Sequence, residues 1–229
     1  LKVGIYIFGI EFLAESGAST WLMWLAAFSI LAASVIAMTK DNLKARLAYS
    51  TISQLSYITL GVALASSMGI LGGGLHVVMH AMGKITLFMC AGSIYVATHR
   101  TEISQMTGLG RRMPITFIAF LIGALSIIGL PPLGGSWSKW LLMVGAVDAE
   151  HLFILGVLLV SSLLNVAYLL PLVAKGFFLS NDTDAELAQS AEASPLVWGP
   201  PAATAFGCVV LFFYAGHIQD FLMPVVATN

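Results

Sequence analysis

Long apolar runs separated by short polar segments dominate this sequence, and they leave few ways for the chain to fold. Of its 229 residues, 59% are hydrophobic and only 9% are charged. A soluble domain carries roughly 25% charged residues and needs them to cover its surface. The composition therefore indicates a lipid bilayer as the solvent, and the net charge of -1 argues against a nucleic-acid partner.

The apolar runs are long enough to be transmembrane helices, because a helix needs about 20 apolar residues to cross a hydrocarbon core of roughly 30 Å. We predict an all-α membrane protein, a polytopic bundle of about seven transmembrane helices with one broken helix. Its segments are a remnant at 1–13 and spans near 19–39, 46–66, 70–97, 114–146, 151–178 and 200–224. Leu1 already lies inside an apolar run, so we expect a chain that is cut at its N-terminus.

The charges in the loops predict an orientation, because cytoplasmic loops near helix ends collect Lys and Arg. With these spans, one set of alternate loops receives Lys40, Lys44, Arg46, Arg100, Arg111, Arg112 and Lys175. The other set carries Glu11, Glu15, Asp148, Glu150 and Asp220. We therefore expect a cell (inner) membrane protein with its basic loops in the cytoplasm and its C-terminus outside. On this reading, 179–197 is a polar cytoplasmic loop and 198–229 holds the last transmembrane helix.

Three basic residues, Lys2, Lys84 and Lys139, fall inside apolar spans, where a charge costs at least a few kcal/mol. Lys84 shares one stripe of its helix with His76 and His80, because the three are spaced by four residues. Lysine and histidine can exchange protons near neutral pH, whereas arginine cannot. These five residues are therefore our predicted proton path. Hydrogen bonds between helices and metal ligation are the alternative roles for the histidines.

Lys139 follows a run that must interrupt its helix, since proline lacks the N–H donor and glycine loosens the backbone. The run contains Pro131, Pro132 and Gly134, and the span around it is too long for one straight crossing. Broken helices at membrane depth line polar cavities and recur at ion sites in transporters. A kink that only helps packing is the alternative, and it explains the prolines but not the lysine.

A weaker polar stripe lies on the span 46–66, where Ser53 and Gln54 accompany Ser50 and Tyr57 at helical spacing. These groups either hold water or fasten neighbouring helices together, as polar side chains commonly do in membranes. No Asp or Glu falls inside a span. Because a buried lysine needs an acidic partner or must be largely neutral, either the lysines titrate or their partners lie on other chains.

Several motifs resemble those of the antiporter-like subunits shared by complex I, membrane-bound hydrogenases and Mrp-type cation/proton antiporters. They are Asp41-Asn42-Leu43-Lys44-Ala45-Arg46-Leu47-Ala48-Tyr49-Ser50-Thr51-Ile52-Ser53-Gln54-Leu55, His80-Ala81-Met82-Gly83-Lys84-Ile85-Thr86-Leu87-Phe88, Gly108-Leu109-Gly110-Arg111-Arg112-Met113-Pro114 and Gly129-Leu130-Pro131-Pro132, which precedes Lys139. They occur in the order that the family has, and together they cover most of the chain.

The resemblance implies the C-terminal half of a fourteen-helix fold that contains two inverted repeats, each with a broken helix. Residues 1–178 would then be a proton-translocation repeat, with a remnant of helix eight followed by helices nine to thirteen. Lys2 would be the central lysine of helix eight, Lys84 and His80 would belong to helix eleven, and Lys139 to helix twelve. Gln54 stands where some relatives carry histidine.

The motif wording is most similar to the D-type component of the Mrp antiporters, including the run Trp137-Ser138-Lys139-Trp140. That implies a proton-conducting subunit of a hetero-oligomeric antiporter for sodium or a similar cation, with no cofactor and no catalytic chemistry of its own. The alternative is a proton-pumping subunit of a complex I-like NADH-quinone oxidoreductase or a membrane-bound hydrogenase. A third reading is a structural scaffold, in which Lys84 and Lys139 are dispensable.

Overall fold

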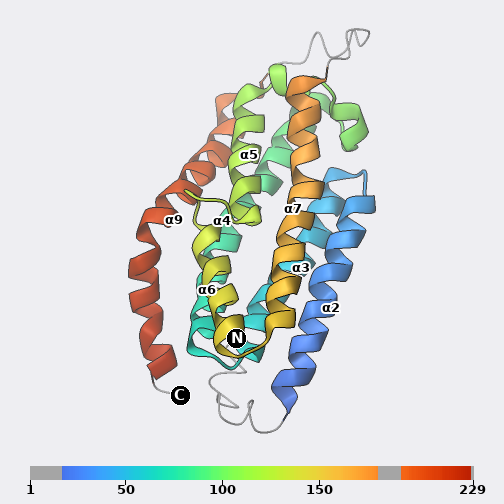
Figure 1. Cartoon of the computed structure of the whole chain (residues 1–229). Helices are drawn as coiled ribbons and strands as arrows, with labels where there is room; N and C mark the ends of the chain where they lie inside the picture. Colours follow the sequence, from blue (N-terminus) through green and yellow to red (C-terminus); the bar gives the residue numbers. More distant parts are fainter. Residues whose placement is uncertain (1–16, 180–191, 228–229) are drawn as a thin grey trace.

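The computed structural model describes residues 17–179 and 192–227, and these residues form a bundle of α-helices (Figure 1). In chain order the helices are α2 (Ala18–Thr39), α3 (Leu43–Ala63), α4 (Ser67–Thr98), α5 (Pro114–Ile128), α6 (Gly135–Asp148), α7 (Leu152–Phe178) and α9 (Pro195–Ala227). Two 3-10 helices, η2 (Ile103–Met106) and η3 (Leu109–Arg111), connect α4 to α5. The all-α class is confirmed, and the described ranges contain no named strand. The remnant at 1–13, with Lys2, lies outside them.

Local sequence signals set the helix ends. The side chain of Asn42 accepts a hydrogen bond from the backbone N–H of Ala45 and caps α3, and Ser66 caps α4 in the same way. Helix α9 begins at Pro195 rather than at residue 198, because proline is well tolerated in the first turn of a helix. Among the described helices, α2, α4, α7 and α9 are each long and apolar enough to cross a membrane.

The span 114–146 consists of two helices, α5 and α6, with residues 129–134 between them. Helix α5 ends at Gly129, whose φ of 92° lies in the left-handed region that favours glycine. Gly135 begins α6 against the end of α5, where an added Cβ would lie 1.8 Å from the carbonyl oxygen of Ser126. A glycine is therefore required at this contact, and the predicted break is confirmed.

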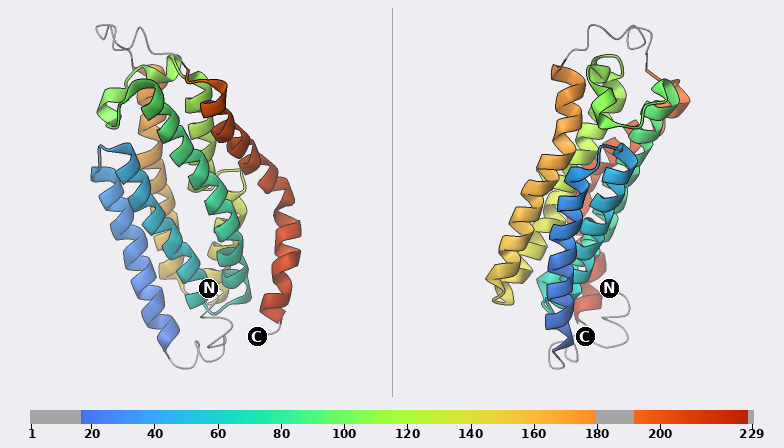
Figure 2. Two further views of the ribbon diagram at one scale, coloured as in Figure 1. Left: turned by 180° about the vertical axis from the view of Figure 1, so that it is seen from behind. Right: turned by 90° about the vertical axis from the view of Figure 1, so that its right-hand side faces the viewer.

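Helix α4 lies at the centre of the bundle and packs against α3, α5, α6 and α9. Helix α7 packs against α2, α5 and α6, and α9 packs mainly against α4 and α5, so that α2 and α9 flank the bundle (Figures 1 and 2). The α2–α3 and α4–α5 connections and the end of α7 share one end of the bundle (Figure 1). This is the basic end, because all seven loop cations named above lie on these segments.

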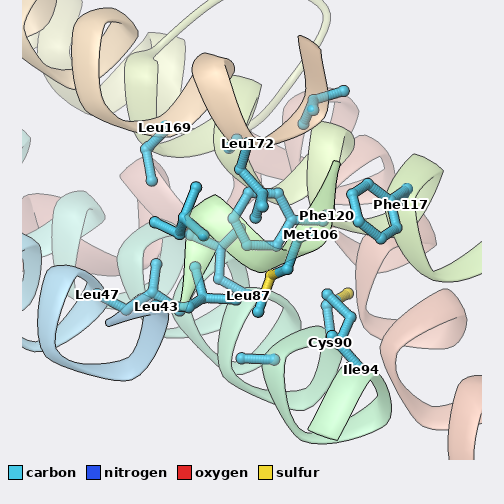
Figure 3. Packing of buried hydrophobic residues seen from close by; sticks show 14 of the residues in the cluster. Leu43, Leu47, Leu87, Cys90, Ile94, Met106, Phe117, Phe120, Leu169 and Leu172 are labelled. Atoms are coloured by element: carbon cyan, nitrogen blue, oxygen red, sulfur yellow. The ribbon is translucent and has the colours of Figure 1, made fainter. Parts of the chain in front are cut away.

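The apolar core is divided into two clusters along the bundle. The first cluster lies toward the basic end and joins α3, α4, α5 and α7 (Figure 3); its members include Leu43, Leu47, Leu87, Phe117, Phe120 and Leu169. The second cluster joins α2, α3, α6 and α7; its members include Met23, Tyr57, Leu60, Leu142 and Leu158. Along α3, the residues between Leu47 and Tyr57 include several buried polar ones. A polar layer therefore separates the two clusters.

Candidate functional site

The polar layer is built from four helices, α3, α4, α6 and α7. Its buried polar side chains are Ser50, Ser53, Gln54, His76, His80, Lys84, Ser138, Lys139, Ser161 and Asn165. The structure thus brings four of the five predicted proton-path residues into one buried layer, and the fifth, Lys2, lies outside the described residues. The three that come from α4 lie together because residues spaced by four share a helix face.

Lys84 is only 5% exposed, and its amine bonds to uncharged oxygens of α3. The Nζ atom donates to Ser50 Oγ at 2.7 Å and to the carbonyl oxygen of Leu47 at 3.1 Å. A neutral amine has two N–H donors and an ammonium has three, so both forms can satisfy these two acceptors. The site can therefore hold Lys84 in place while the residue gains or loses a proton.

Lys139 is 3% exposed and binds the end of the broken helix. Its Nζ donates to the carbonyl oxygen of Ile128 at 3.0 Å and to Ser162 Oγ at 3.1 Å. The residues three and four positions after Ile128 are Pro131 and Pro132, which have no N–H to offer that carbonyl. The lysine replaces the missing donor at a helix C-terminus, where the helix dipole also favours a cation. The two prolines thus create the acceptor that Lys139 uses.

The two histidines connect the surroundings of the two lysines. Their rings stack with centroids 5.7 Å apart, and the ring of Tyr57 stacks on His76 at 5.3 Å. His76 Nδ1 shares a hydrogen bond of 2.9 Å with the hydroxyl of Ser138, the residue before Lys139. His80 precedes Lys84 by one helical turn. Imidazoles in this position can accept a proton on one nitrogen and release it from the other.

The polar stripe on α3 divides between two roles. Ser53 Oγ bonds to Ser34 Oγ at 2.9 Å and to the carbonyl oxygen of Ile30 at 3.0 Å, so it fastens α3 to α2. Gln54 is fully buried, and neither of its amide atoms has a hydrogen-bond partner among the described residues. Of the two roles predicted for this stripe, Ser53 fits helix packing and Gln54 fits water binding.

Helix α7 contributes polar residues that the sequence reasoning missed. Ser162 bonds to Lys139, and the hydroxyl of Tyr168 contacts both Ser50 Oγ, at 2.8 Å, and Asn165 Oδ1. The α7 side chains lie three positions apart in an otherwise apolar run. That spacing was the signal that could have found them, because it puts all of them on one helix face.

The surroundings of Lys139 also include a cavity of about 490 Å³ beside the helix break. It is lined by Gly129, Pro131, Ser136, Trp137, Lys139, Trp140, Met143 and Phe212. In the part of the chain that the structure describes, no group of three or more His, Cys, Asp or Glu side chains is placed to hold a metal ion. The chemistry that this layer can perform is proton binding, release and relay.

Comparison with known families identifies the chain at the level of the family. A family model described as "NADH:quinone oxidoreductase/Mrp antiporter, TM" matches residues 1–165. The chain belongs to this family. The resemblance carried by the motifs is thereby confirmed, without a distinction between the branches of the family.

Among curated proteins, the chain is similar to NADH-quinone oxidoreductase subunit N of Desulforudis audaxviator, with 39% identity over 68% of the chain and 31% of that protein. It is also similar to NADH-quinone oxidoreductase subunit L of Rickettsia bellii, with 31% identity over 90% of the chain and 31% of that protein. The chain thus spans about a third of the length of these relatives.

Two solved structures contain a chain of the same fold. A chain of respiratory complex I from Thermus thermophilus with bound NADH matches with a TM-score of 0.83 and 26% identity, covering 98% of this chain and 48% of that one. A chain of the Mrp complex from Dietzia sp. matches with a TM-score of 0.80 and 23% identity, covering 93% of this chain and 48% of that one. The fold is therefore that of about half of a membrane protein found in multisubunit complexes.

Proposed function

We propose that this chain is the proton-conducting C-terminal half of a membrane subunit, and that protons pass between Lys139 and Lys84 through its polar layer. One observation carries the proposal: two buried lysines bond to uncharged oxygens, and a stack of His76 and His80 joins their surroundings. Lys2 extends the same path on the evidence of its sequence position. The other membrane subunits of a hetero-oligomeric complex are its partners.

Energetics support a functional role for these lysines. A charged lysine at the centre of a bilayer costs about 3 kcal/mol, and a scaffold gains nothing in return. The acceptors around Lys84 suit both protonation states, and Lys139 reaches the same layer from a separate helix. Side chains that exchange protons need this adaptability, whereas a purely structural contact would be better served by an apolar residue.

The finer proposal is a component like the D-type one of a multisubunit sodium/proton antiporter of the Mrp class, with its basic end in the cytoplasm and its C-terminus outside a cell membrane. It is supported by the wording of the motifs around His80–Pro114 and Trp137–Trp140, and the fold found in the Mrp complex is compatible with it. The second candidate is a pumping subunit of a redox complex, which the quinone oxidoreductase relatives favour. In both cases the chain conducts protons and carries out no redox chemistry.

Reconstitution of the purified parent complex in proteoliposomes tests the shared core of both proposals. Proton flux is measured with an internal pH dye for the wild type, Lys84→Ala, Lys139→Ala and the surface control Lys44→Ala. We expect a loss of about tenfold or more for the first two, since each removes a proton-binding group, and wild-type flux for the control. Undiminished flux in both buried variants would reject the proposal and favour the scaffold.

The driving force separates the two branches. For an antiporter, a sodium gradient alone drives proton movement in the same vesicles. For a redox subunit, proton movement requires an electron donor and a quinone or proton acceptor, and sodium gradients have no effect. Proton movement driven by the donor alone would therefore reject the antiporter assignment while leaving the proton path intact.

A further inference from the structure

Helix α7 offers a second connection between the two lysines, apart from the histidine stack. At one end, Ser162 Oγ accepts a hydrogen bond from Lys139 Nζ at 3.1 Å. At the other end, Tyr168 contacts Ser50, which in turn accepts from Lys84 Nζ. Asn165 lies between Ser162 and Tyr168 on the same face of the helix. The two ends of this connection are therefore already bonded to the lysines.

The hydroxyl of Tyr168 has one proton and two acceptors. Ser50 Oγ lies 2.8 Å away on α3, and Asn165 Oδ1 lies within hydrogen-bond distance on α7 itself. Because a phenol can donate to only one of them at a time, the hydroxyl has two orientations. The carbonyl oxygen of Tyr168 accepts from Arg46 Nη1 at 3.0 Å, which anchors this turn of α7 to α3. The backbone is thus held while the O–H group can turn.

Three buried polar atoms gather in the interval between Tyr168 and Ser162. They are Asn165 Nδ2, Ser161 Oγ and the hydroxyl of Tyr57, and none has a hydrogen-bond partner among the described residues. The Tyr57 hydroxyl faces Ser161, Ser162 and Asn165. Buried polar groups are almost always satisfied, and a buried water typically takes two to four polar partners. These three groups, from α3 and α7, meet that requirement.

We propose that Tyr168 and Asn165 form a relay on α7 that carries protons between Lys139 and Lys84, with a water molecule bound between Asn165, Ser161 and Tyr57. The inference rests on the proposed function and deepens it. Tyr168 transfers the proton, and Asn165 is a positioning residue that binds the water and accepts the Tyr168 O–H in its resting orientation.

The transfer balances when every relay group gains one proton and loses one. Lys139 as ammonium gives a proton to Ser162, whose own proton passes to the bound water. The water passes a proton to Tyr168, and Tyr168 gives its O–H proton to Ser50. Ser50 then gives its proton to Lys84 as the neutral amine. Lys139 ends neutral and Lys84 ends charged, and the Tyr168 hydroxyl returns to Asn165 before the next transfer.

The test uses proton flux of the reconstituted parent complex. Tyr168→Phe removes one hydroxyl and keeps the ring, and its matched control is Tyr95→Phe at the surface. We expect flux to fall about tenfold in Tyr168→Phe, as for a barrier raised by one lost hydrogen bond, and to stay at the wild-type level in the control. Wild-type flux in Tyr168→Phe would overturn the relay and leave the histidine stack as the route.

A pair of variants at Asn165 separates a polar role from packing. Asn165→Leu keeps the volume and removes both polar groups, whereas Asn165→Ser is smaller but keeps a hydroxyl and leaves room for water. The relay predicts low flux for Asn165→Leu and recovery in Asn165→Ser. A packing role predicts the reverse order, which would overturn the assignment of Asn165.

Lys84→Ala, measured in parallel, distinguishes failure of the relay from failure of the proposed function. If Lys84→Ala and the Asn165 and Tyr168 variants all retain flux, the proposed function itself fails. If Lys84→Ala loses flux while Tyr168→Phe and Asn165→Leu retain it, only the α7 relay fails.

Discussion

Replacing Lys84 with methionine should make the protein more stable while it abolishes proton flux. Methionine has nearly the same length and shape as the lysine stem, so it fills the same space without the charge. The two former acceptors keep other partners, because the carbonyl of Leu47 also accepts from Thr51 Oγ1 at 2.9 Å and Ser50 Oγ also contacts Tyr168 at 2.8 Å. The substitution therefore leaves neither oxygen without a hydrogen bond.

The magnitude follows from the charge and from the two hydrogen bonds. Removing a charge from the membrane interior recovers about 3 kcal/mol. Losing the two hydrogen bonds of Nζ costs about 1 kcal/mol each. The free energy of unfolding should thus rise by about 1 kcal/mol, in the direction found when buried ionic groups are replaced by apolar residues of similar volume.

The assay compares thermal unfolding of the parent complex in detergent for Lys84→Met, Lys84→Ala and Lys44→Met. We expect the midpoint of Lys84→Met to rise by about 2–4 °C. Lys84→Ala should fall below Lys84→Met because the shortened side chain leaves a cavity, and the surface variant should match the wild type. A Lys84→Met protein less stable than the wild type would show that the lysine is structural, and the energetic support for its function would fail.

Three further predictions concern the polar layer and its supports, each measured as a change in the free energy of unfolding. Lys139→Met should be about 2 kcal/mol less stable than Lys84→Met, since it leaves the carbonyl of Ile128 without a donor; equal stabilities would contradict the role given to the prolines. Gly135→Ala should cost about 1–3 kcal/mol because its Cβ would meet the carbonyl oxygen of Ser126, and a neutral effect would refute that contact. Ser53→Ala should cost about 1 kcal/mol through its lost bonds to α2, whereas Ser56→Ala on the same helix serves as the exposed control.

Features that depend on one helix could be predicted from the sequence. His76, His80 and Lys84 share a face because of helical spacing, and the break before Lys139 follows from glycine and proline chemistry. Contacts between helices could not be predicted in this way. The sequence shows Lys139 after a break, but its bond to the carbonyl of Ile128 arises only when α6 folds back on α5.

Three further residues show the same limit. Ser50 and Ser53 belong to one stripe by spacing, yet Ser50 meets Lys84 while Ser53 meets α2, since the packing of the neighbouring helices decides which partner each finds. Asn165 carries no charge, so it lacks the energetic signal that singles out a lysine in an apolar span. An uncharged polar residue there gains meaning only from its neighbours, which include Tyr168.

The arrangement of the core explains how a proton path can exist in this bundle without becoming a channel. The first and second apolar clusters lie on either side of the polar layer, and neither contains a charged side chain. Water crossing the bundle along its axis would have to displace residues such as Phe120 or Leu142, which are at most 1% exposed. Protons can move within the layer by short transfers between fixed groups, whereas a hydrated ion cannot. The lateral position of the cavity at Lys139 then gives this lysine the place where the layer exchanges protons with its surroundings.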